Sequence, residues 1–516
     1  MSHRGHLNAT TRDDALIELR DGAPLDVLVV GGGVTGAGAA LDAASRGLRT
    51  ALVERRDLAW GTSRWSSKLV HGGLRYLASG AVGIAMESAR ERGILLEHTA
   101  PHLVRPIRQV IPLTPAVPRA VERKTLAGLH LGDGLRRAAH TSSDVLPRTR
   151  RVDPAELLRV APGVRRDRLR GGLVAWDAQL EDDARLVVAL ARTAAAHGAQ
   201  VATRCAAVDV HPGGAELRDE RTGETFDVAA RTIITATGVW TPELTPGLTL
   251  RPSRGSHLVV PLARLGGLAG ILSIPVPGDP SRFVFAIPQR WGVAYVGITD
   301  EEVPGAVPDV PEAPPHDIAF LLETLSVALE RPLTEDDVVG TFAGLRPLVD
   351  GAADRRSADL SREHLVREDP GGRITVVGGK LTTYRQMAED AVDAAVRAGA
   401  LLAGPSRTAQ LPLVGAAPRA ALAAVPAPAR LVDRHGTEAP DVLALAAGDR
   451  DLLAPLAPGL DVLRVEVLHA LRAEGALDAD DVLDRRTRLG LVPADRERVR
   501  PVVEELVRAH ARVPVA

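Results

Sequence analysis

One stretch, residues 25–54, constrains the fold of this 516-residue chain more than any other part of the sequence. It contains two continuous apolar runs of strand length, Asp26–Val30 and Thr50–Glu54, as expected for strands buried on both faces of a parallel sheet. A glycine-rich turn and a helix of small residues over 37–45 join the two runs. This pattern predicts a βαβ unit, and hence an α/β fold with a parallel sheet.

The turn has the spacing Gly31-x-Gly33-x-x-Gly36. Glycines at these places permit a tight turn, a close approach of the backbone to a pyrophosphate and close packing of the helix on the strand. Glu54 ends the second strand, where an acidic side chain can bond the ribose hydroxyls of an adenosine. The pattern therefore predicts a dinucleotide site at the helix start, where N–H groups and the helix dipole favour phosphates.

The chain leaves this unit early and returns to glycine-containing turns much later. A hydroxyl-rich loop follows at Gly61–Leu69, and short turns recur at Ala236–Gly238 and Gly378–Lys380. An NAD domain would continue with further βα units in one block, whereas separate returns suit the longer cofactor FAD. We therefore predict FAD. The predicted cofactor contacts are Gly31, Gly33, Gly36, Glu54, Thr62, Ser63, Ser66, Ser67, Lys68, Gly72, Gly73, Thr237, Gly238, Gly379, Lys380, Leu381 and Thr382.

Lysine and tyrosine are rare in this chain, which has three of each and otherwise uses arginine as its cation. Both types nevertheless occur in two glycine-rich segments, SSKLVHGGLRYL (66–77) and GGKLTTYR (378–385). A lysine kept in such a sequence can mark a place where a planar guanidinium does not fit. In the first segment, Arg75 offers a two-pronged donor for a phosphate or carboxylate and Tyr76 adds a hydroxyl. A basic surface loop is the alternative interpretation.

Three further residues are candidates for the chemistry. Arg346 follows a glycine turn in GLRPL, which indicates a guanidinium fixed at a strand end; a structural salt bridge is the alternative. Lys380 precedes Thr382 at a predicted helix start, which can face an anion or an electron-rich ring edge. His257 begins a strand, where a neutral imidazole near a flavin can take a hydroxyl proton as hydride leaves the neighbouring carbon. A purely structural histidine is the alternative there.

The rest of the pattern divides the chain into three parts. We expect a polar N-terminal arm over 1–24, an oxidoreductase region over 25–404 and a C-terminal helical domain over 405–516. The predicted FAD-binding parts are about 25–80, 170–245 and 340–400, and the predicted substrate-domain parts are about 81–169 and 246–339. Helices are predicted over 12–20, 84–97, 184–197, 315–329 and 385–400, and a linker that wraps an edge over 411–430. The strand-rich stretch from about 250 to 345 favours an antiparallel sheet.

Composition excludes several classes of protein. The net charge of -2 gives no sign of nucleic-acid binding. The single cysteine, Cys205, excludes internal disulfides, a Cys-ligated iron–sulfur cluster and a Cys-type zinc site, and no metal site is predicted. No apolar run reaches the length of a membrane span, and the N-terminus lacks the apolar middle of a signal peptide. A cytoplasmic protein is expected.

These motifs together resemble one family. The segments VGGGVTGAGAALDAASRG, SSKLVHGGLRYL, GSHLVVP, GLRPL and GGKLTTYRQMA are similar to the FAD-dependent glycerol-3-phosphate dehydrogenases of the aerobic type. The resemblance runs from about Leu25 to the end, and the segments 430–436 and 480–490 resemble the helical cap domain of that family. It implies a Rossmann-like FAD-binding domain of the D-amino-acid-oxidase type, an antiparallel-sheet substrate domain and a C-terminal helical cap domain.

The resemblance also implies an activity. This is oxidation of sn-glycerol 3-phosphate to dihydroxyacetone phosphate in glycerol and glycerophospholipid catabolism, with electrons passed to a membrane quinone. Carried over by motif, Arg75, Tyr76, Arg346, Arg362 and Lys380 line the substrate site, and His257, Arg346 and Lys380 are the catalytic candidates. Quinone use implies peripheral contact with the inner face of the cell membrane, for which the apolar and basic stretch 125–137 is a candidate. An ordinary helical hairpin on the substrate domain is the alternative.

Other functions remain open at this point. An oxidase that gives electrons to oxygen is the nearest, although members of that kind are expected to carry an insertion for which this length leaves little room. The anaerobic-type subunit of the family ends in a cysteine-rich region, against which the single Cys205 argues. An amine or amino-acid oxidase of the same fold needs one cation for a carboxylate and not a phosphate-sized set. A flavin-bound interaction protein without turnover is the alternative from another class. The sequence predicts no oligomeric state.

Overall fold

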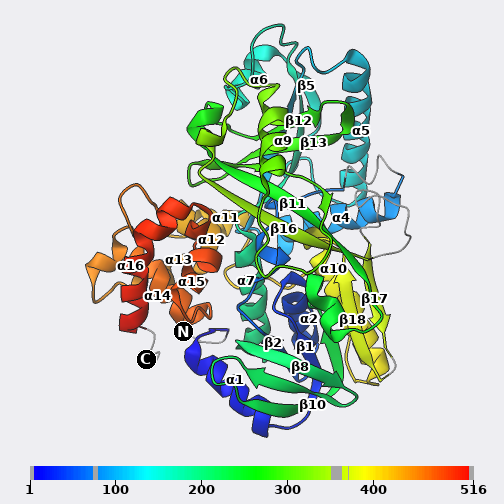
Figure 1. The fold of residues 1–516 in the computed structure, drawn as a ribbon, viewed down its shortest axis with the longest axis vertical. Coiled ribbons are helices and arrows are strands. Elements are labelled where there is room, and N and C mark those ends of the chain that lie inside the picture. The colour runs from blue at the N-terminus through cyan, green and yellow to red at the C-terminus, as the bar shows by residue number, and fades with distance from the viewer. Residues whose placement is uncertain (1–4, 74–79, 350–362, 370, 511–516) are drawn as a thin grey trace.

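The computed structural model describes residues 5–73, 80–349, 363–369 and 371–510. Two β-sheets organise this part of the chain, one in the lower half of Figure 1 and one in the upper half. Helices from the C-terminal part of the chain gather at one side of the two sheets (Figure 1). The architecture is therefore a mixed α/β fold with a separate group of C-terminal helices, as the sequence predicts.

The lower sheet contains the βαβ unit, and its strand order is β17-β18-β10-β1-β2-β7. Neighbours from β18 to β7 pair in parallel, and β17 pairs antiparallel to β18 at the edge. A hairpin of β8 and β9 continues from the first half of β10. The strands are β1 (Leu25–Val30), β2 (Thr50–Glu54), β7 (Gln200–Thr203), β8 (Cys205–His211), β9 (Gly214–Asp219), β10 (Thr225–Thr235), β17 (His364–Glu368) and β18 (Arg373–Gly378).

Both faces of the lower sheet are covered, which explains the continuous apolar runs of its central strands. Val27 and Val29 of β1 belong to a core shared with three helices, α2 (Val34–Ser45), α7 (Asp183–Ala196) and α10 (Tyr384–Ala398). Leu28 and Val30 belong to a second core on the other face, which α1 (Ala9–Asp21) and the β8–β9 hairpin close. Alternate residues of one strand thus serve two cores, as expected for a parallel sheet between layers.

The upper sheet is mostly antiparallel, with the order β15-β11-β14-β13-β12-β4-β6-β3. Its strands are β3 (Leu69–Val70), β4 (Val104–Pro112), β6 (Gly172–Leu180), β11 (Leu250–Pro261), β12 (Ile271–Val276), β13 (Asp279–Pro288), β14 (Val293–Gly297) and β15 (Glu301–Glu302). The short β5 (Arg150–Val152) pairs with β6, and β16 (Gly340–Val349) pairs with β11 along its whole length. The helices α6 (Pro154–Val160) and α9 (Pro315–Ser326) pack on this sheet. The antiparallel sheet predicted for 250–345 is confirmed.

The long strands β11 and β16 connect the two halves of the molecule (Figure 1). β16 contacts β18 of the lower sheet, so residues of both sheets meet where these strands run. The helix α4 (Val82–Ile94) lies beside this junction and packs on a 3₁₀ turn, η7 (Leu381–Thr383), at the start of α10. The candidate site is at this junction.

The C-terminal helices dock on the start of α7 and on the loop after β2. They are α11 (Arg419–Ala423), α12 (Ala429–His435), α13 (Ala439–Ala444), α14 (Arg464–Ala473), α15 (Ala479–Asp481) and α16 (Pro493–His510). The N-terminal segment joins them, because the N–H of Leu7 donates to Ala473 and the N–H of Gly475 donates to Leu7.

Two local predictions need correction. The helix predicted over 84–97 is α-helical only to Ile94, because the backbone continues as a π-helical turn over Leu95–Thr99. The predicted linker 411–430 is not a plain connector. Leu413 is buried in the core of the lower sheet, and α11 forms within the segment. The apolar side chains that the sequence analysis treated as linker composition therefore serve packing.

Candidate active site

The glycine turn after β1 has the geometry that a pyrophosphate site requires. Gly31 adopts a φ of 111°, and a side-chain carbon at Gly36 would lie 1.9 Å from the carbonyl oxygen of Gly31. Gly33 is the N-cap of α2 and offers no side-chain cap to the first-turn N–H groups. The helix start therefore approaches its surroundings with backbone alone, which is the arrangement that binds phosphate.

Glu54 lies at the end of β2, beside this turn. Its carboxylate accepts hydrogen bonds from the backbone N–H of Gly32 at 2.6 Å and of Arg56 at 2.7 Å. Burial raises the pKa of Glu54, and these two bonds oppose that rise. The acid is thus fixed next to the helix N-terminus, at the place where the ribose hydroxyls of an adenosine are bound in dinucleotide sites. The residues present fit FAD at this end.

The hydroxyl-rich loop is held by contacts with three separate elements. The Thr62 hydroxyl donates to the carbonyl of Leu345 on β16 at 2.6 Å, and the Ser63 hydroxyl accepts from the N–H of Val34 at 2.9 Å. Ser66 donates to the Asp183 carboxylate through its N–H at 2.9 Å and its hydroxyl at 2.8 Å. The loop therefore connects α2, α7 and β16.

Lys68 is 1% exposed and ends this loop. Its ammonium donates to the carbonyls of Arg64 at 3.1 Å and Ser66 at 2.9 Å, and to the Asp183 carboxylate at 2.8 Å. Burial lowers the pKa of Lys68 to about 8, although the Asp183 charge opposes this. The three donors of the ammonium have three protein acceptors, and the backbone N–H and carbonyl of Lys68 bond to Ser66 and Leu180, so the cofactor contact of Lys68 stays a prediction.

His257 is completely buried on β11. Its Nε2 lies 2.8 Å from the Ser67 hydroxyl, and its ring stacks on Phe342 with 4.5 Å between centroids. Burial, followed by the charges of Lys68 and Arg346, holds the pKa of His257 well below 6.5. The imidazole is therefore neutral near pH 7, as a proton acceptor must be.

Arg346 lies on β16 directly opposite Ser253 of β11. Its guanidinium donates to the Asp300 carboxylate at 3.2 Å, to the Ser253 hydroxyl at 3.3 Å and to the carbonyl of Thr299 at 3.1 Å. The side chain keeps 20% of its surface exposed. The structure thus contains the ion pair that the sequence analysis named as an alternative.

Lys380 follows two glycines in left-handed conformations, Gly378 with a φ of 85° and Gly379 with a φ of 66°. It is the N-cap of η7, and its ammonium donates to the Ser88 hydroxyl of α4 at 2.8 Å. A side-chain carbon at Gly73 would lie 3.2 Å from the Ser88 side chain. The lysine of the second segment and the glycine pair of the first segment are therefore brought together across α4.

Four site residues were missed by the sequence analysis: Ser88, Arg92, Asp177 and Asp183. The Gly72 N–H donates to Asp177 at 3.1 Å, and Arg92 donates to the same carboxylate oxygen at 2.8 Å. Asp177 interrupts the apolar strand GLVAWDAQL, and Arg92 is buried on a helix. The only signal in the sequence was a charged residue at a position that the apolar pattern predicts to be buried.

Some predicted site residues receive no structural account. Arg75, Tyr76 and Arg362 lie outside the described residues. Thr237 and Gly238 follow β10, and Gly238 adopts a φ of 57°. This turn lies against the glycine turn after β1, because a side-chain carbon at Gly31 would lie 2.6 Å from the carbonyl oxygen of Ala236. Leu381 and Thr382 form the first part of η7. The two later glycine turns thus lie at the ends of β10 and β18 in the lower sheet.

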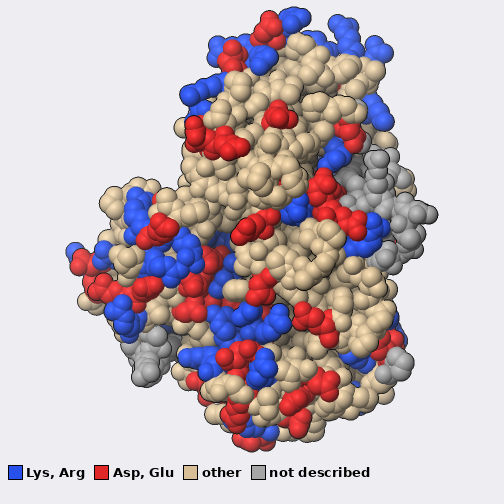
Figure 2. Space-filling view, in the orientation of Figure 1, with Lys and Arg blue, Asp and Glu red and all other residues tan. Residues whose placement is uncertain are grey.

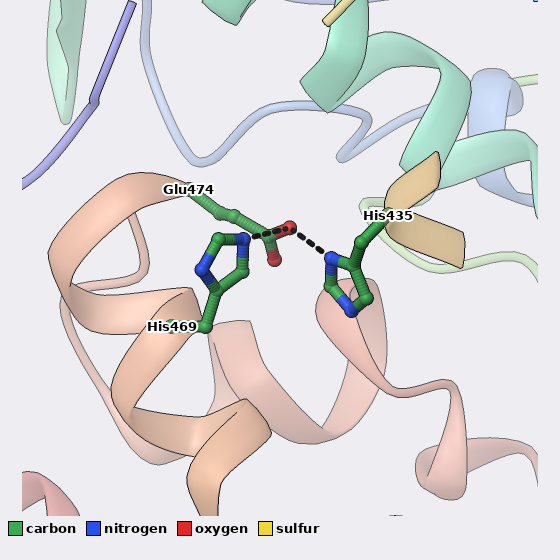
Figure 3. Close-up of side chains that lie close together, drawn as sticks. All are labelled: His435, His469 and Glu474. Atoms are coloured by element: carbon green, nitrogen blue, oxygen red, sulfur yellow. Dashed lines mark ion pairs between the residues drawn. The ribbon is translucent and has the colours of Figure 1, made fainter. Parts of the chain in front are cut away.

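A second polar cluster lies between α7 and the C-terminal helices. His435 of α12 and His469 of α14 point at the carboxylate of Glu474 (Figure 3), and the ligand-type atoms lie within 4.8 Å of one another. Arg185 takes both oxygens of that carboxylate, at 2.5 and 3.0 Å. Burial and the Arg185 charge lower the pKa of His435 to about 3. Because the guanidinium already neutralises Glu474 and would repel a cation, the cluster is explained as an ion-pair network that fastens the helices to α7.

Comparison with known protein families gives two consecutive matches. The family model described as FAD dependent oxidoreductase covers residues 26–402. The one described as C-terminal domain of alpha-glycerophosphate oxidase covers residues 406–512. Together they span most of the chain.

Several curated proteins are similar over the whole chain. Glycerol-3-phosphate dehydrogenase 1 of Mycobacterium tuberculosis is 51% identical over 98% of this chain and 99% of its own length. Glycerol-3-phosphate dehydrogenase 2 of the same species is 41% identical over 90% of this chain and 81% of its own length. The mitochondrial glycerol-3-phosphate dehydrogenase of Macaca fascicularis is 34% identical over 96% of this chain and 72% of its own length.

Two solved structures share the fold. The glycerol-3-phosphate dehydrogenase from Bacillus halodurans complexed with FAD has a TM-score of 0.74 and 27% identity, and the match covers 99% of this chain and 96% of that one. The L-alpha-glycerophosphate oxidase from Mycoplasma pneumoniae, at 19% identity and a TM-score of 0.56 over 76% of this chain and 99% of its own, shows the fold alone. The chain therefore belongs to the FAD-dependent oxidoreductases, with FAD as its cofactor, and within them to the glycerol-3-phosphate dehydrogenases.

Proposed function

We propose that the protein oxidises sn-glycerol 3-phosphate to dihydroxyacetone phosphate. The observation that carries the proposal is a neutral, buried histidine placed among cations. His257 is uncharged near pH 7, and the charge of Arg346 acts on it directly. Lys380 reaches α4 beside the glycine pair that follows the hydroxyl-rich loop, and Ser67 of this loop contacts His257. A phosphorylated alcohol needs both features, because its phosphate requires cations and its hydroxyl requires a proton acceptor.

FAD, when bound, supplies the acceptor for the hydride of the alcohol carbon. Arg346 and Lys380 are proposed to hold the substrate phosphate, and Arg75, Tyr76 and Arg362 are proposed to complete that set. His257 is proposed as the final acceptor of the hydroxyl proton. The pairing of Arg346 with Asp300 supports its role as a positioned cation, because a buried carboxylate fixes the guanidinium before substrate arrives.

We further propose a quinone as the electron acceptor and a place in glycerol and glycerophospholipid catabolism. The relatives that cover the whole chain are named dehydrogenases, which favours an acceptor other than oxygen. The solved L-alpha-glycerophosphate oxidase from Mycoplasma pneumoniae is only 19% identical to this chain, so its similarity supports the fold and not the electron acceptor. An oxidase that uses oxygen remains the alternative.

Peripheral membrane contact through α5 (Arg119–Ala138) is part of the same proposal. Leu129 and Leu135 face the protein, whereas Leu131 is 63% exposed on a surface that also carries Arg123 and Lys124. Figure 2 shows Lys and Arg side chains along the outer edge of the upper half, where α5 runs. An exposed leucine among basic residues suits an anionic lipid surface. In the described part of the chain, no helix is long and apolar enough to cross a membrane.

Anaerobic reduction of the purified holoenzyme tests the activity. Addition of glycerol 3-phosphate without oxygen should bleach the visible flavin band, and glycerol without its phosphate should not. Reoxidation by a soluble quinone and by oxygen, compared at equal concentrations, then separates dehydrogenase from oxidase. A flavin band that stays oxidised in excess glycerol 3-phosphate would disprove the proposed substrate, while faster reoxidation by oxygen would disprove the quinone.

A further inference from the structure

Within the described part of the chain, the imidazole of His257 has no direct access to a substrate hydroxyl. The exposed fraction of the residue is 0%. Its partners in the two neighbouring strands are Phe342, whose ring stacks on the imidazole, and Gly297, where a side-chain carbon would lie 2.3 Å from the ring. Nδ1 is buried and has no hydrogen-bond partner within the described residues. A base that is enclosed in this way can exchange protons only through a group that already touches it.

The Ser67 hydroxyl is that group. It lies 2.8 Å from Nε2 of His257 and belongs to a half-buried residue of the cofactor loop. When the hydroxyl donates to Nε2, its lone pairs face away from the histidine and can accept a hydrogen bond. Ser67 therefore stands between an enclosed base and the accessible side of the loop.

We propose that Ser67 relays the substrate proton to His257, an inference that rests on the proposed oxidation of glycerol 3-phosphate. As the C–H bond breaks and hydride passes to FAD, the substrate hydroxyl gives its proton to the Ser67 oxygen. The proton already on Ser67 moves to Nε2 of His257. The substrate carbon becomes a carbonyl, its hydride would carry both electrons to bound FAD, and His257 gains the proton. The relay uses the neutral tautomer of His257 that carries its hydrogen on Nδ1.

Two buried residues hold the relay in place. Asp183, at the start of α7, accepts from both the N–H and the hydroxyl of Ser66 and from the Lys68 ammonium. Lys68 has a φ of 58°, and its carbonyl accepts from the N–H of Leu180 on β6 at 2.8 Å. The residues on either side of Ser67 are thus both fastened to Asp183. Asp183 and Lys68 are positioning residues, because they act on the reaction through Ser67.

Lys68 also acts on His257 through its charge. Burial is the main cause of the lowered pKa of His257, and the charge of Lys68 lowers this pKa further. Lys68 therefore helps to keep the imidazole neutral and able to receive a proton. An arginine at this position would place a planar fork where three acceptors surround a single ammonium. The rare lysine of the first glycine-rich segment is explained by this geometry.

Anaerobic stopped-flow reduction of the holoenzyme by glycerol 3-phosphate tests the relay. Ser67→Ala should retain FAD and substrate binding but reduce its flavin about 100-fold more slowly, within the usual contribution of a proton-transfer group. Ser67→Thr keeps the hydroxyl and should recover most of the rate. Ser143→Ala, at an exposed position that is not among the site residues, is the matched control and should react as the wild type does.

Two readouts separate a relay from a merely structural serine. In mixtures of H₂O and D₂O, wild-type flavin reduction should show a curved dependence on deuterium content, because two protons move. Ser67→Ala combined with His257→Gln should be no slower than His257→Gln alone, since both changes interrupt one path. The wild-type deuterium curve and the Ser67→Thr rate decide the matter even if Ser67→Ala loses FAD, because neither depends on that variant.

The outcomes are distinguishable. If wild-type flavin is not bleached by glycerol 3-phosphate, the proposed function fails and the relay fails with it. If wild-type flavin is bleached and Ser67→Ala is reduced at the wild-type rate, the relay alone is overturned. Equal slowing in Ser67→Thr and Ser67→Ala, or a linear dependence on deuterium content in the wild type, would overturn it as well.

Discussion

The Asp57→Asn variant should be the most informative single change to stability. Asp57 lies three residues after Glu54 and is fully buried, with Arg485 and Arg486 of the C-terminal helices as its partners. Burial alone would raise the pKa of Asp57, but the two guanidiniums hold it far below its usual range. Asparagine keeps the size of the side chain and removes the charge that both arginines face.

The expected loss in the free energy of unfolding depends on which arginine is left without a carboxylate partner. Loss of one member of a buried ion pair costs about 3–5 kcal/mol. Arg485 keeps a second carboxylate, Asp481, whereas among the described residues Arg486 retains only the carbonyl of Glu474. The lower end, about 3 kcal/mol, is therefore expected, which shifts a urea midpoint by about 1 M at a slope of about 3 kcal/mol/M. The loop after Glu54 leads to Thr62, so FAD should be released within the same transition.

Urea unfolding of the holoenzyme, followed by flavin release and by tryptophan fluorescence, measures this effect. Trp60 is a local probe, because the Arg485 guanidinium lies 4.9 Å from its ring centroid. Asp495→Asn is the control: its partner Arg498 is 46% exposed, and such a pair contributes less than about 1 kcal/mol. Equal midpoints for the two variants would refute the argument that the Asp57 contact fastens the C-terminal helices to the cofactor loop.

Four further outcomes are expected. Arg346→Ala should raise KM for glycerol 3-phosphate and lower kcat, at least tenfold in kcat/KM (about 1.4 kcal/mol); near-normal steady-state turnover would assign the residue to structure alone. Gly36→Ala places a carbon 1.9 Å from a backbone oxygen, so purified protein should lack the visible flavin band. His102 is buried with its pKa lowered to about 3, chiefly by burial, against about 6.5 unfolded. The unfolded state therefore gains a proton as pH falls through 6.5, and unfolding titrations should show His102→Leu losing about 2 kcal/mol less between pH 7 and pH 5 than the wild type. Arg123→Glu with Lys124→Glu should weaken co-sedimentation with anionic vesicles by about 1 kcal/mol per charge removed, without altering flavin reduction; unchanged binding would exclude α5 as the contact.

The parts of the site that the sequence predicts are those encoded by contiguous residues. The glycine turn after β1 and Glu54 are parts of one βαβ unit, whose geometry follows from local pattern. His257 and Arg346 were singled out from short segments, but their distance was not predictable, because it depends on the register of β11 against β16. Asp183 carries no motif at all. It joins the site only because α7 begins beside a loop that lies more than a hundred residues earlier in the chain.

The three lysines show how far a rare residue type can guide prediction. Lys68 occupies a buried place with three acceptors, and Lys380 donates to Ser88 between two elements of the site. Lys124 is exposed on α5 and shows no such constraint. Rarity alone therefore does not identify a functional lysine. Rarity combined with a glycine-rich segment does better, because glycines mark places where backbones approach closely and the space for a cation is limited.

The role of the C-terminal helices is the part that local pattern could least predict. The stretch 480–490 is a short basic and acidic segment, typical of a solvated helix. In the structure its arginines point inward: Arg485 and Arg486 meet Asp57, and Arg488 donates to the carbonyl of Arg64 in the cofactor loop. Arg64 is also the residue whose carbonyl accepts from Lys68. The C-terminal helices thus contact the same loop that carries Ser67, so a change at Arg488 should alter flavin reduction as well as stability.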